Sequence, residues 1–95
     1  MDRLKGKVAI ITGASSGIGE GTAELFVKEG AAVVLTARRV DRLNALAEKI
    51  KKAGGKALVV PGDVTKVADV KNVIEQTIKT FGKIDILVNN AGISD

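Results

Sequence analysis

The 95-residue sequence contains no cysteine, no histidine, no tyrosine and no tryptophan. Without cysteine there is no disulfide, no thiol nucleophile and no cysteine-ligated metal. Without histidine there is no imidazole base and none of the common zinc sites. The only aromatic residues are Phe26 and Phe81, so a core has to be built from Val, Ile, Leu and Ala. We therefore expect no metal site and find few of the side chains that catalysis commonly uses.

Long apolar runs are also missing. No run of 18 apolar residues exists, so no membrane span is expected. Met1–Arg3 is not followed by the apolar region of a signal peptide, so the expected location is cytoplasmic.

The net charge is +4, which suits binding of nucleic acid or of small anionic ligands. Because aromatics are few and basic residues cluster only at Arg38, Arg39 and Arg42, nucleic acid is the weaker alternative.

Short apolar runs alternate with segments of helical periodicity. Continuous Val, Ile and Leu runs are typical of strands that are buried on both faces of a parallel sheet. The four predicted strands are Val8–Ile11, Val33–Leu35, Leu58–Val60 and Ile84–Val88. The three predicted helices cover approximately residues 17–29, 40–53 and 66–81. Glycines that tolerate a left-handed backbone follow the helices, at Gly30, Gly54-Gly55 and Gly82.

The spacing of apolar residues predicts one buried face on each helix. On the first helix this face holds Ile18, Thr22, Leu25 and Phe26. On the second it holds Leu43, Leu46, Ala47 and Ile50. On the third it holds Val67, Val70, Val73, Ile74, Ile78 and Phe81, with Thr65 as the predicted N-cap.

Right-handed crossovers between the strands then predict one α/β domain over residues 1–95, with three α/β/α layers and a four-stranded parallel sheet in the order 3-2-1-4.

A glycine-rich loop, Thr12-Gly-Ala-Ser-Ser-Gly-Ile-Gly19, joins the first strand to the first helix. Gly13 permits a sharp turn, Gly17 lets a pyrophosphate approach the backbone, and Gly19 lets the helix pack closely. The helix N-terminus attracts anions through its free N–H groups. The loop is not a Walker A motif, because Glu20 follows Gly19 where a lysine would be needed. The plainer alternative is that these glycines only make a turn.

Asp63-Val64 follows the third strand and Asn89-Asn90-Ala91-Gly92 follows the fourth. With the glycine loop, these motifs resemble the N-terminal half of a short-chain dehydrogenase/reductase over essentially the whole chain. The resemblance implies a Rossmann-like sheet that is half of a doubly wound fold. It implies that the pyrophosphate and the adjoining ribose are lined by Gly13, Ser15, Gly17, Ile18 and Gly19.

The resemblance also assigns the residues around the adenosine. Asp63 accepts from the adenine amino group and Val64 backs the ring, while Asn90, Ala91 and Gly92 lie along the ribose. Asn89 is expected to be a structural tie between neighbouring strands. The alternative for Asp63 is a carboxylate that accepts from amides near Thr65, and the two roles can coexist.

The end of the second strand favours NADP(H) over NAD(H). An NAD site commonly has an acidic residue there for the ribose 2′-hydroxyl, whereas this chain has Thr36-Ala37-Arg38-Arg39. A guanidinium binds a 2′-phosphate through two N–H groups. Arg38 is therefore the predicted phosphate ligand, with Arg39 assisting and Ser15 and Ser16 donating hydroxyls. The alternative is that both arginines are exposed residues at the start of a helix.

The catalytic serine and Tyr-x-x-x-Lys pair that the resemblance implies follow the Asn-Asn-Ala-Gly motif, and the sequence extends only three residues beyond it, to Asp95. No residue is assigned as catalytic. We expect the NADP(H)-binding half of an oxidoreductase that transfers hydride between nicotinamide and an alcohol or carbonyl. The alternative is a non-catalytic or engineered minimal nucleotide-binding module.

The fourth predicted strand would be an apolar sheet edge, and one sheet face would carry a single helix. Exposed apolar surface of this kind drives association. We therefore expect a homodimer that forms through the fourth strands or by exchange of an element.

Overall fold

The computed structural model describes residues 3–90, so the predicted site residues Ala91 and Gly92 lie outside the described residues. Strands and helices alternate along the described chain, which confirms the predicted α/β class, and their ends differ from the predicted ones by at most two residues. The strands are β1 (Val8–Thr12), β2 (Ala32–Thr36), β3 (Ala57–Val59) and β4 (Ile86–Asn89). The helices are α1 (Gly17–Lys28), α2 (Asp41–Lys52) and α3 (Val67–Phe81).

The strands form one parallel sheet in the order β3-β2-β1-β4, as predicted. Ile10 in β1 pairs with Val34 in β2 and with Leu87 in β4. All five residues of β1 are buried, because the strand has neighbours on both edges and packed side chains on both faces. This two-sided burial explains why its sequence is continuously apolar.

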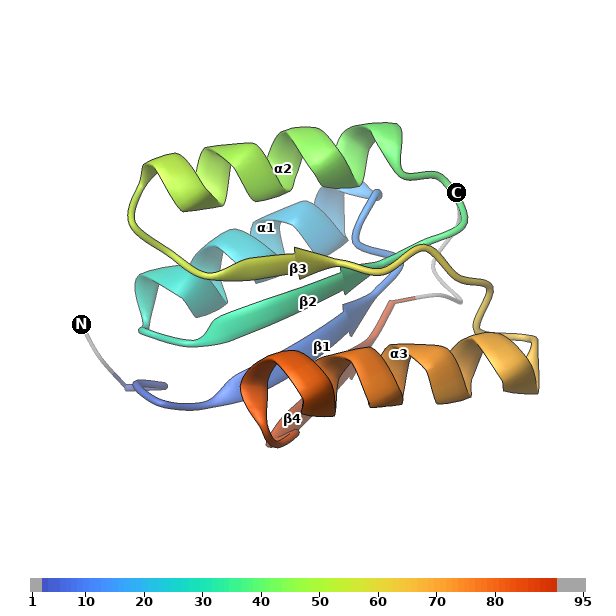
Figure 1. Cartoon of the computed structure of the whole chain (residues 1–95). Coiled ribbons are helices and arrows are strands. Elements are labelled where there is room, and N and C mark those ends of the chain that lie inside the picture. Colours follow the sequence, from blue (N-terminus) through green and yellow to red (C-terminus); the bar gives the residue numbers. More distant parts are fainter. Residues whose placement is uncertain (1–2, 91–95) are drawn as a thin grey trace.

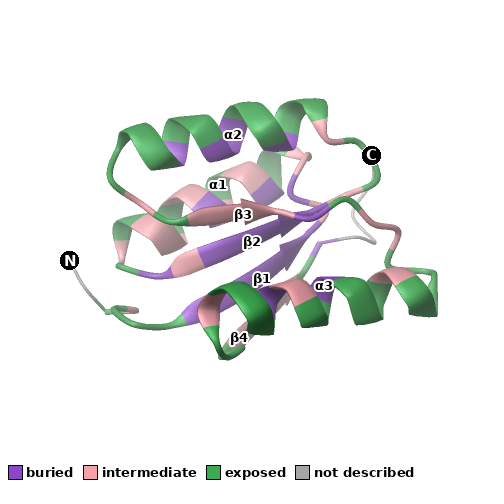
Figure 2. Cartoon of the chain, in the orientation of Figure 1, coloured by how far each residue is buried: buried purple, intermediate pink, exposed green. Residues whose placement is uncertain are grey.

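The helices cover the two faces of the sheet unequally. Figure 1 shows α1 and α2 on one face and α3 on the other. Alternate strand residues point to opposite faces, so Ile11 and Leu35 belong to the core under α1 and α2, whereas Ile10 and Val34 belong to a smaller core with Val73 of α3. Figure 2 shows the buried residues concentrated in β1 and β2.

The predicted face of α2 is confirmed, since Leu43, Leu46, Ala47 and Ile50 are all buried. The predicted face of α1 is partly wrong. Ile18 and Leu25 are 58% and 55% exposed, and the buried residues of this helix are Gly19 and Ala23. At Gly19 the start of α1 lies directly against the glycine loop, which leaves no room for a side chain.

The apolar stripe of α3 is present but only partly covered. Val73 and Thr77 are buried, whereas Val67, Ile74 and Ile78 are 73%, 44% and 46% exposed. Figure 2 shows the outer turns of α3 in the colour of exposed residues. An apolar groove of about 310 Å³ lies between α3 and β4 and includes Val70, Ile74, Ile84 and Leu87.

Candidate functional site

The candidate site lies at the carboxyl ends of the strands, where the loops after β1, β2 and β3 meet. In the loop after β1, Gly13 has φ of +61°, a left-handed conformation that favours glycine. The amide N of Ala14 donates to the carbonyl O of Thr36 over 3.4 Å, and that of Ser16 donates to the carbonyl O of Gly13 over 3.1 Å. The first bond holds the glycine loop against the end of β2, and the second closes the turn within the loop.

Ser16 is the N-cap of α1. Its Oγ accepts from the amide of Gly19 over 3.0 Å and donates to the carbonyl O of Gly13 over 2.9 Å. A serine hydroxyl has one proton, so this proton is used within the loop. Ser15 and Ser16 were both predicted to donate a hydroxyl to the phosphate. The Ser16 hydroxyl instead caps the helix, whereas the Ser15 hydroxyl is not used as the cap.

Gly17 and Gly19 differ in what surrounds them. A Cβ on Gly19 would lie 2.4 Å from the carbonyl O of Gly13 and 2.7 Å from the Cα of Ala14, whereas a Cβ on Gly17 would meet nothing within 4 Å. Gly19 is thus required by the fold. Gly17 faces open space, so a ligand can approach the backbone there without meeting a side chain.

The first turn of α1 presents amide groups to that open space. The first amides of a helix have no acceptor within the helix, and here the Ser16 hydroxyl caps only the amide of Gly19. Gly17 and Ile18 precede it in the first turn, at the positive end of the helix dipole. Their N–H groups provide the chemistry that binds a phosphate.

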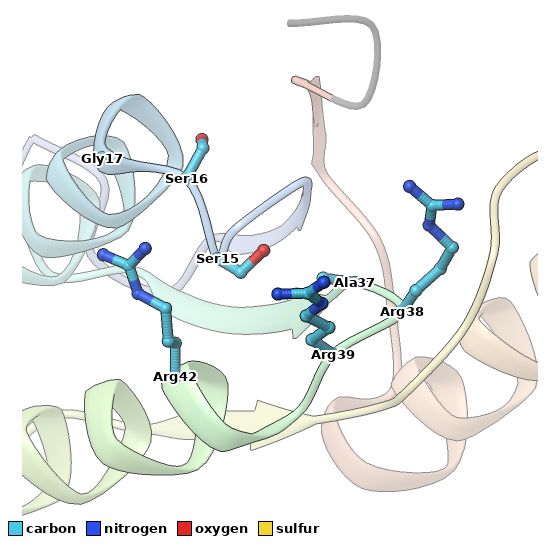
Figure 3. Close-up of a pocket in the computed structure, with 7 residues that line it drawn as sticks. All are labelled: Ser15, Ser16, Gly17, Ala37, Arg38, Arg39 and Arg42. Carbon is cyan, nitrogen blue, oxygen red and sulfur yellow. The ribbon is translucent and has the colours of Figure 1, made fainter. Parts of the chain in front are cut away.

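A basic pocket of about 570 Å³ lies beside this turn. It is lined by Ser15, Ser16, Gly17, Ala37, Arg38, Arg39 and Arg42. Figure 3 shows the three arginines entering from the end of β2 and the start of α2, opposite the glycine loop. No acidic residue is among the described residues that line this pocket. The structure therefore brings together the predicted residues Ser15, Ser16, Gly17, Arg38 and Arg39.

Arg42 is a residue of this pocket that our sequence analysis did not assign. It lies in the first turn of α2, and its Nη2 is 3.1 Å from Glu20 Oε2 on α1. A usable signal existed, because the first turn of a helix that follows a parallel strand lies at the same sheet edge as the end of that strand.

A smaller pocket of about 180 Å³ adjoins Arg38 and includes Gly13, Asp63 and Val64. Asp63 Oδ1 accepts from the Thr65 amide over 2.9 Å and from Thr65 Oγ1 over 2.7 Å. The hydrogen bond from the Thr65 hydroxyl, then that from its amide, and then the charge of Arg38 lower the pKa of Asp63 below its ordinary value. Asp63 is therefore an ionised acceptor at neutral pH, and its expected local role beside Thr65 is confirmed.

The predicted N-cap at Thr65 is wrong. The N-cap of α3 is Lys66, which makes no side-chain capping bond. The Thr65 hydroxyl turns back to Asp63 instead, because an aspartate two residues earlier offers a charged acceptor for both the amide and the hydroxyl.

Asn89 and Asn90 lie at the end of β4. Thr12 Oγ1 donates to Asn89 Oδ1 over 2.9 Å and accepts from the amide of Asn90 over 3.0 Å. This arrangement confirms the expectation that Asn89 ties neighbouring strands. Asn90 is buried and lies outside the linings of the two pockets at Arg38.

None of the helices within residues 3–90 has the length and apolar character that a membrane span requires. Within the same range, acidic side chains do not gather in a group that could hold a metal ion.

Comparison with known proteins places this site in a family. The profile described as short chain dehydrogenase matches residues 7–95. The chain is 50% identical over 93 residues to 11-beta-hydroxysteroid dehydrogenase-like 2 of Arabidopsis thaliana, which covers 97% of this chain and 30% of that protein. It is 48% identical over 92 residues to glucose 1-dehydrogenase of Gluconobacter oxydans, covering 96% of this chain and 35% of that protein.

Solved structures agree with these matches. Glucose dehydrogenase of Caenorhabditis elegans superimposes with a TM-score of 0.88 at 47% identity, over 97% of this chain and 40% of that one. Hydroxysteroid dehydrogenase from Escherichia coli gives a TM-score of 0.88 at 40% identity, over 92% and 37%. The chain spans about a third of the length of the curated relatives named above. The glycine loop, the parallel sheet and these matches together show that the chain belongs to the short-chain dehydrogenase family.

Proposed function

We propose that this chain is the NADP(H)-binding half of a short-chain oxidoreductase. Membership of the family implies a nicotinamide dinucleotide as cofactor. The observation that carries the choice of NADP(H) is the basic pocket beside the glycine loop, in which three arginines and no carboxylate are among the lining residues that the structure describes.

The described residues fit the parts of such a cofactor. The amides of Gly17 and Ile18 and the open space at Gly17 suit the pyrophosphate. The ionised carboxylate of Asp63, with Val64 beside it, suits the amino group and one face of the adenine. When bound, the cofactor supplies or accepts hydride, whereas the residues of this chain bind and orient it.

Charge at the end of β2 separates the two dinucleotides. The 2′-phosphate of NADP(H) is a phosphate monoester with close to two negative charges at neutral pH. A guanidinium binds it through two parallel N–H groups. Arg38 and Arg39 follow Ala37 directly after β2 and line the basic pocket. An NAD site would instead need an acceptor for the ribose 2′-hydroxyl at this position.

Fluorescence titration tests this proposal directly. The chain has no tryptophan or tyrosine, so the emission of NADPH or NADH can be followed with little protein background. We expect tighter binding of NADPH than of NADH. We expect Arg38→Ala to weaken NADPH binding by about 10- to 100-fold, as loss of hydrogen bonds to a charged group does, and to change NADH binding little.

Lys52→Ala is the matched control, because Lys52 is an exposed cation at the far end of α2. Equal or tighter binding of NADH by the unmodified chain would contradict the proposal. An Arg38→Ala variant that keeps the full NADPH affinity would contradict it as well.

The relatives suggest the reaction of the complete protein. Their names include a hydroxysteroid dehydrogenase and glucose dehydrogenases, which share oxidation of a hydroxyl group as their chemistry. We propose that the complete protein interconverts an alcohol and a carbonyl compound with this cofactor. The relatives' names mention a hydroxysteroid and a sugar, so they assign no particular substrate, and no residue of this chain is proposed as catalytic.

We further propose that this chain by itself pairs with a second copy through β4. Within the described residues, β4 pairs only with β1, and its Leu87 is 66% exposed. The groove beside it is lined mostly by apolar side chains, among them Val70 and Ile74 of α3 and Leu87 of β4. Two copies whose β4 edges meet would cover the edge and both grooves at once.

A further inference from the structure

Arg42 extends the basic pocket to the start of α1. Figure 3 shows its side chain reaching from α2 toward Gly17, and its guanidinium lies 3.1 Å from the carboxylate of Glu20. Glu20 is in the first turn of α1, one residue beyond the last glycine of the loop. The ion pair therefore holds Arg42 on the wall of the pocket that faces the first turn of α1.

A second ion pair also joins α1 to α2, but it lies outside the basic pocket. Lys49 Nζ lies 2.7 Å from Glu24 Oε2, with side-chain exposures of 71% and 42%. Lys49 lines a different groove that includes Glu24, Leu25 and Ile50. Exposed ion pairs of either kind contribute little to stability. The two pairs thus tie α1 to α2 in the same way, and only the pair with Arg42 lies on the basic pocket.

The charge of Arg38 is shared between two pockets, so a further cation can contribute to the basic pocket. Arg38 lies beside the carboxylate of Asp63 in the adjoining pocket, so part of its charge acts there. A guanidinium has five N–H donors in a planar fork, and a contact from Nη2 to Glu20 uses one nitrogen. The rest of the Arg42 fork can reach a phosphate without breaking that contact.

We infer that Arg42 is a specificity-determining residue that binds the 2′-phosphate of NADP(H) together with Arg38 and Arg39, and that Glu20 is its positioning residue. This inference rests on the proposed function, since it assigns one more ligand to the same cofactor. Glu20 holds the guanidinium at the pocket and offsets its charge when no phosphate is bound.

Titration of Arg42→Ala with NADPH and NADH tests the inference, with Lys49→Ala as the matched control. We expect Arg42→Ala to weaken NADPH binding by about five- to tenfold, because a partly exposed charged hydrogen bond is lost, and to change NADH binding less than about twofold. Lys49→Ala should change neither. Arg42→Lys should recover part of the affinity, because it keeps the charge and loses the fork.

Removing Arg42 leaves the Glu20 carboxylate beside the pocket without its partner, where it repels a phosphate. We therefore expect Arg42→Ala with Glu20→Gln to bind NADPH more tightly than Arg42→Ala alone. An unchanged affinity in the double variant would show that Glu20 does not act on this pocket.

The outcomes separate this inference from the proposed function. If the unmodified chain prefers NADPH and Arg38→Ala removes that preference while Arg42→Ala keeps it, only the role of Arg42 is wrong. Equal losses of NADPH and NADH binding in Arg42→Ala would also overturn it, since they would mean a general disturbance of α2. If the unmodified chain has no preference for NADPH, both proposals fail.

Discussion

At the scale of single residues, Gly19 and Gly17 have separate tasks within one loop. A Cβ on Gly19 would be 2.4 Å from the carbonyl O of Gly13. The atoms that it would meet belong to the backbone of the glycine loop, which cannot easily move. We expect Gly19→Ala to lower the free energy of unfolding by about 1–3 kcal/mol, as overpacking does. Denaturant unfolding followed by circular dichroism measures this.

Gly21 is the matched control for that loss. It lies in the same helix, and a Cβ there would meet nothing within 4 Å. We expect Gly21→Ala to be neutral or to stabilise by up to about 1 kcal/mol, because alanine is the better helix former. If both variants lost the same stability, the close contact at Gly19 would not be the cause.

Gly17→Ala should give the opposite profile to Gly19→Ala. The added Cβ meets no protein atom, so we expect an unchanged unfolding free energy. It would lie where a pyrophosphate approaches the first-turn amides, so binding of NADPH and NADH should both weaken by roughly tenfold, or about 1.4 kcal/mol. Unchanged affinity for both cofactors would place the pyrophosphate elsewhere.

At the scale of elements, β1 and β4 are tied by side chains at both ends. At the carboxyl end Thr12 links to Asn89 and Asn90. At the other end the Val8 amide donates to Asp85 Oδ2 over 2.8 Å, and Lys83 Nζ lies 3.3 Å from the same oxygen. These contacts fix the register of β4, a strand of four residues that has β1 as its one neighbour within residues 3–90.

The Asp85 contact gives the pairing of these strands a pH dependence. The hydrogen bond from the Val8 amide, more than the nearby lysines, lowers the pKa of Asp85 below 3.8. A lowered carboxyl pKa stabilises the fold above the unfolded-state pKa, and this stabilisation is lost as pH falls through the folded-state value. We expect Asp85→Ala to lower the melting temperature at neutral pH, by an amount that shrinks below pH 3.8. Melting curves across this range measure it, and a gap that stayed constant into acid would contradict this account.

The sequence predicted the elements better than their contacts. The α2 face was predictable because Leu43, Leu46 and Ile50 recur at helical spacing against a sheet. The α1 face was not, since Ala23 and Gly19 are buried for their small size, which hydrophobic periodicity does not detect. In the site, strand ends and loop glycines are local signals, so Gly17 and Arg38 were predictable. Arg42 was missed although its place in the first turn of α2, directly after the loop from β2, puts it at the same sheet edge as Arg38.

At the scale of the whole molecule, several apolar side chains of α3 and β4 are exposed. Ile74, Ile78 and Leu87 are 44%, 46% and 66% exposed, on the face that carries one helix (Figure 1). Contiguous exposed apolar surface is typical of an interface. This is the basis for the proposed pairing of two chains through β4.

A charge placed in this surface should prevent the pairing. We expect light scattering to show dimers of the unmodified chain at micromolar concentration and monomers of Leu87→Lys. Leu25→Lys is the matched control, because Leu25 is 55% exposed on α1, which covers the other face of the sheet. A folded monomer of the unmodified chain, or equal effects of the two substitutions, would contradict the pairing through β4.

The central claim is that the first-turn amides of α1 hold the diphosphate of the cofactor, with the arginines after β2 beside them. Its most direct measurement is the amide NMR spectrum of the isotope-labelled chain during titration with NADPH. We predict that the Gly17 and Ile18 amide signals shift with the binding curve, together with those of Ser15 and Arg38. Saturable binding that leaves the Gly17 and Ile18 amides unchanged would contradict the account.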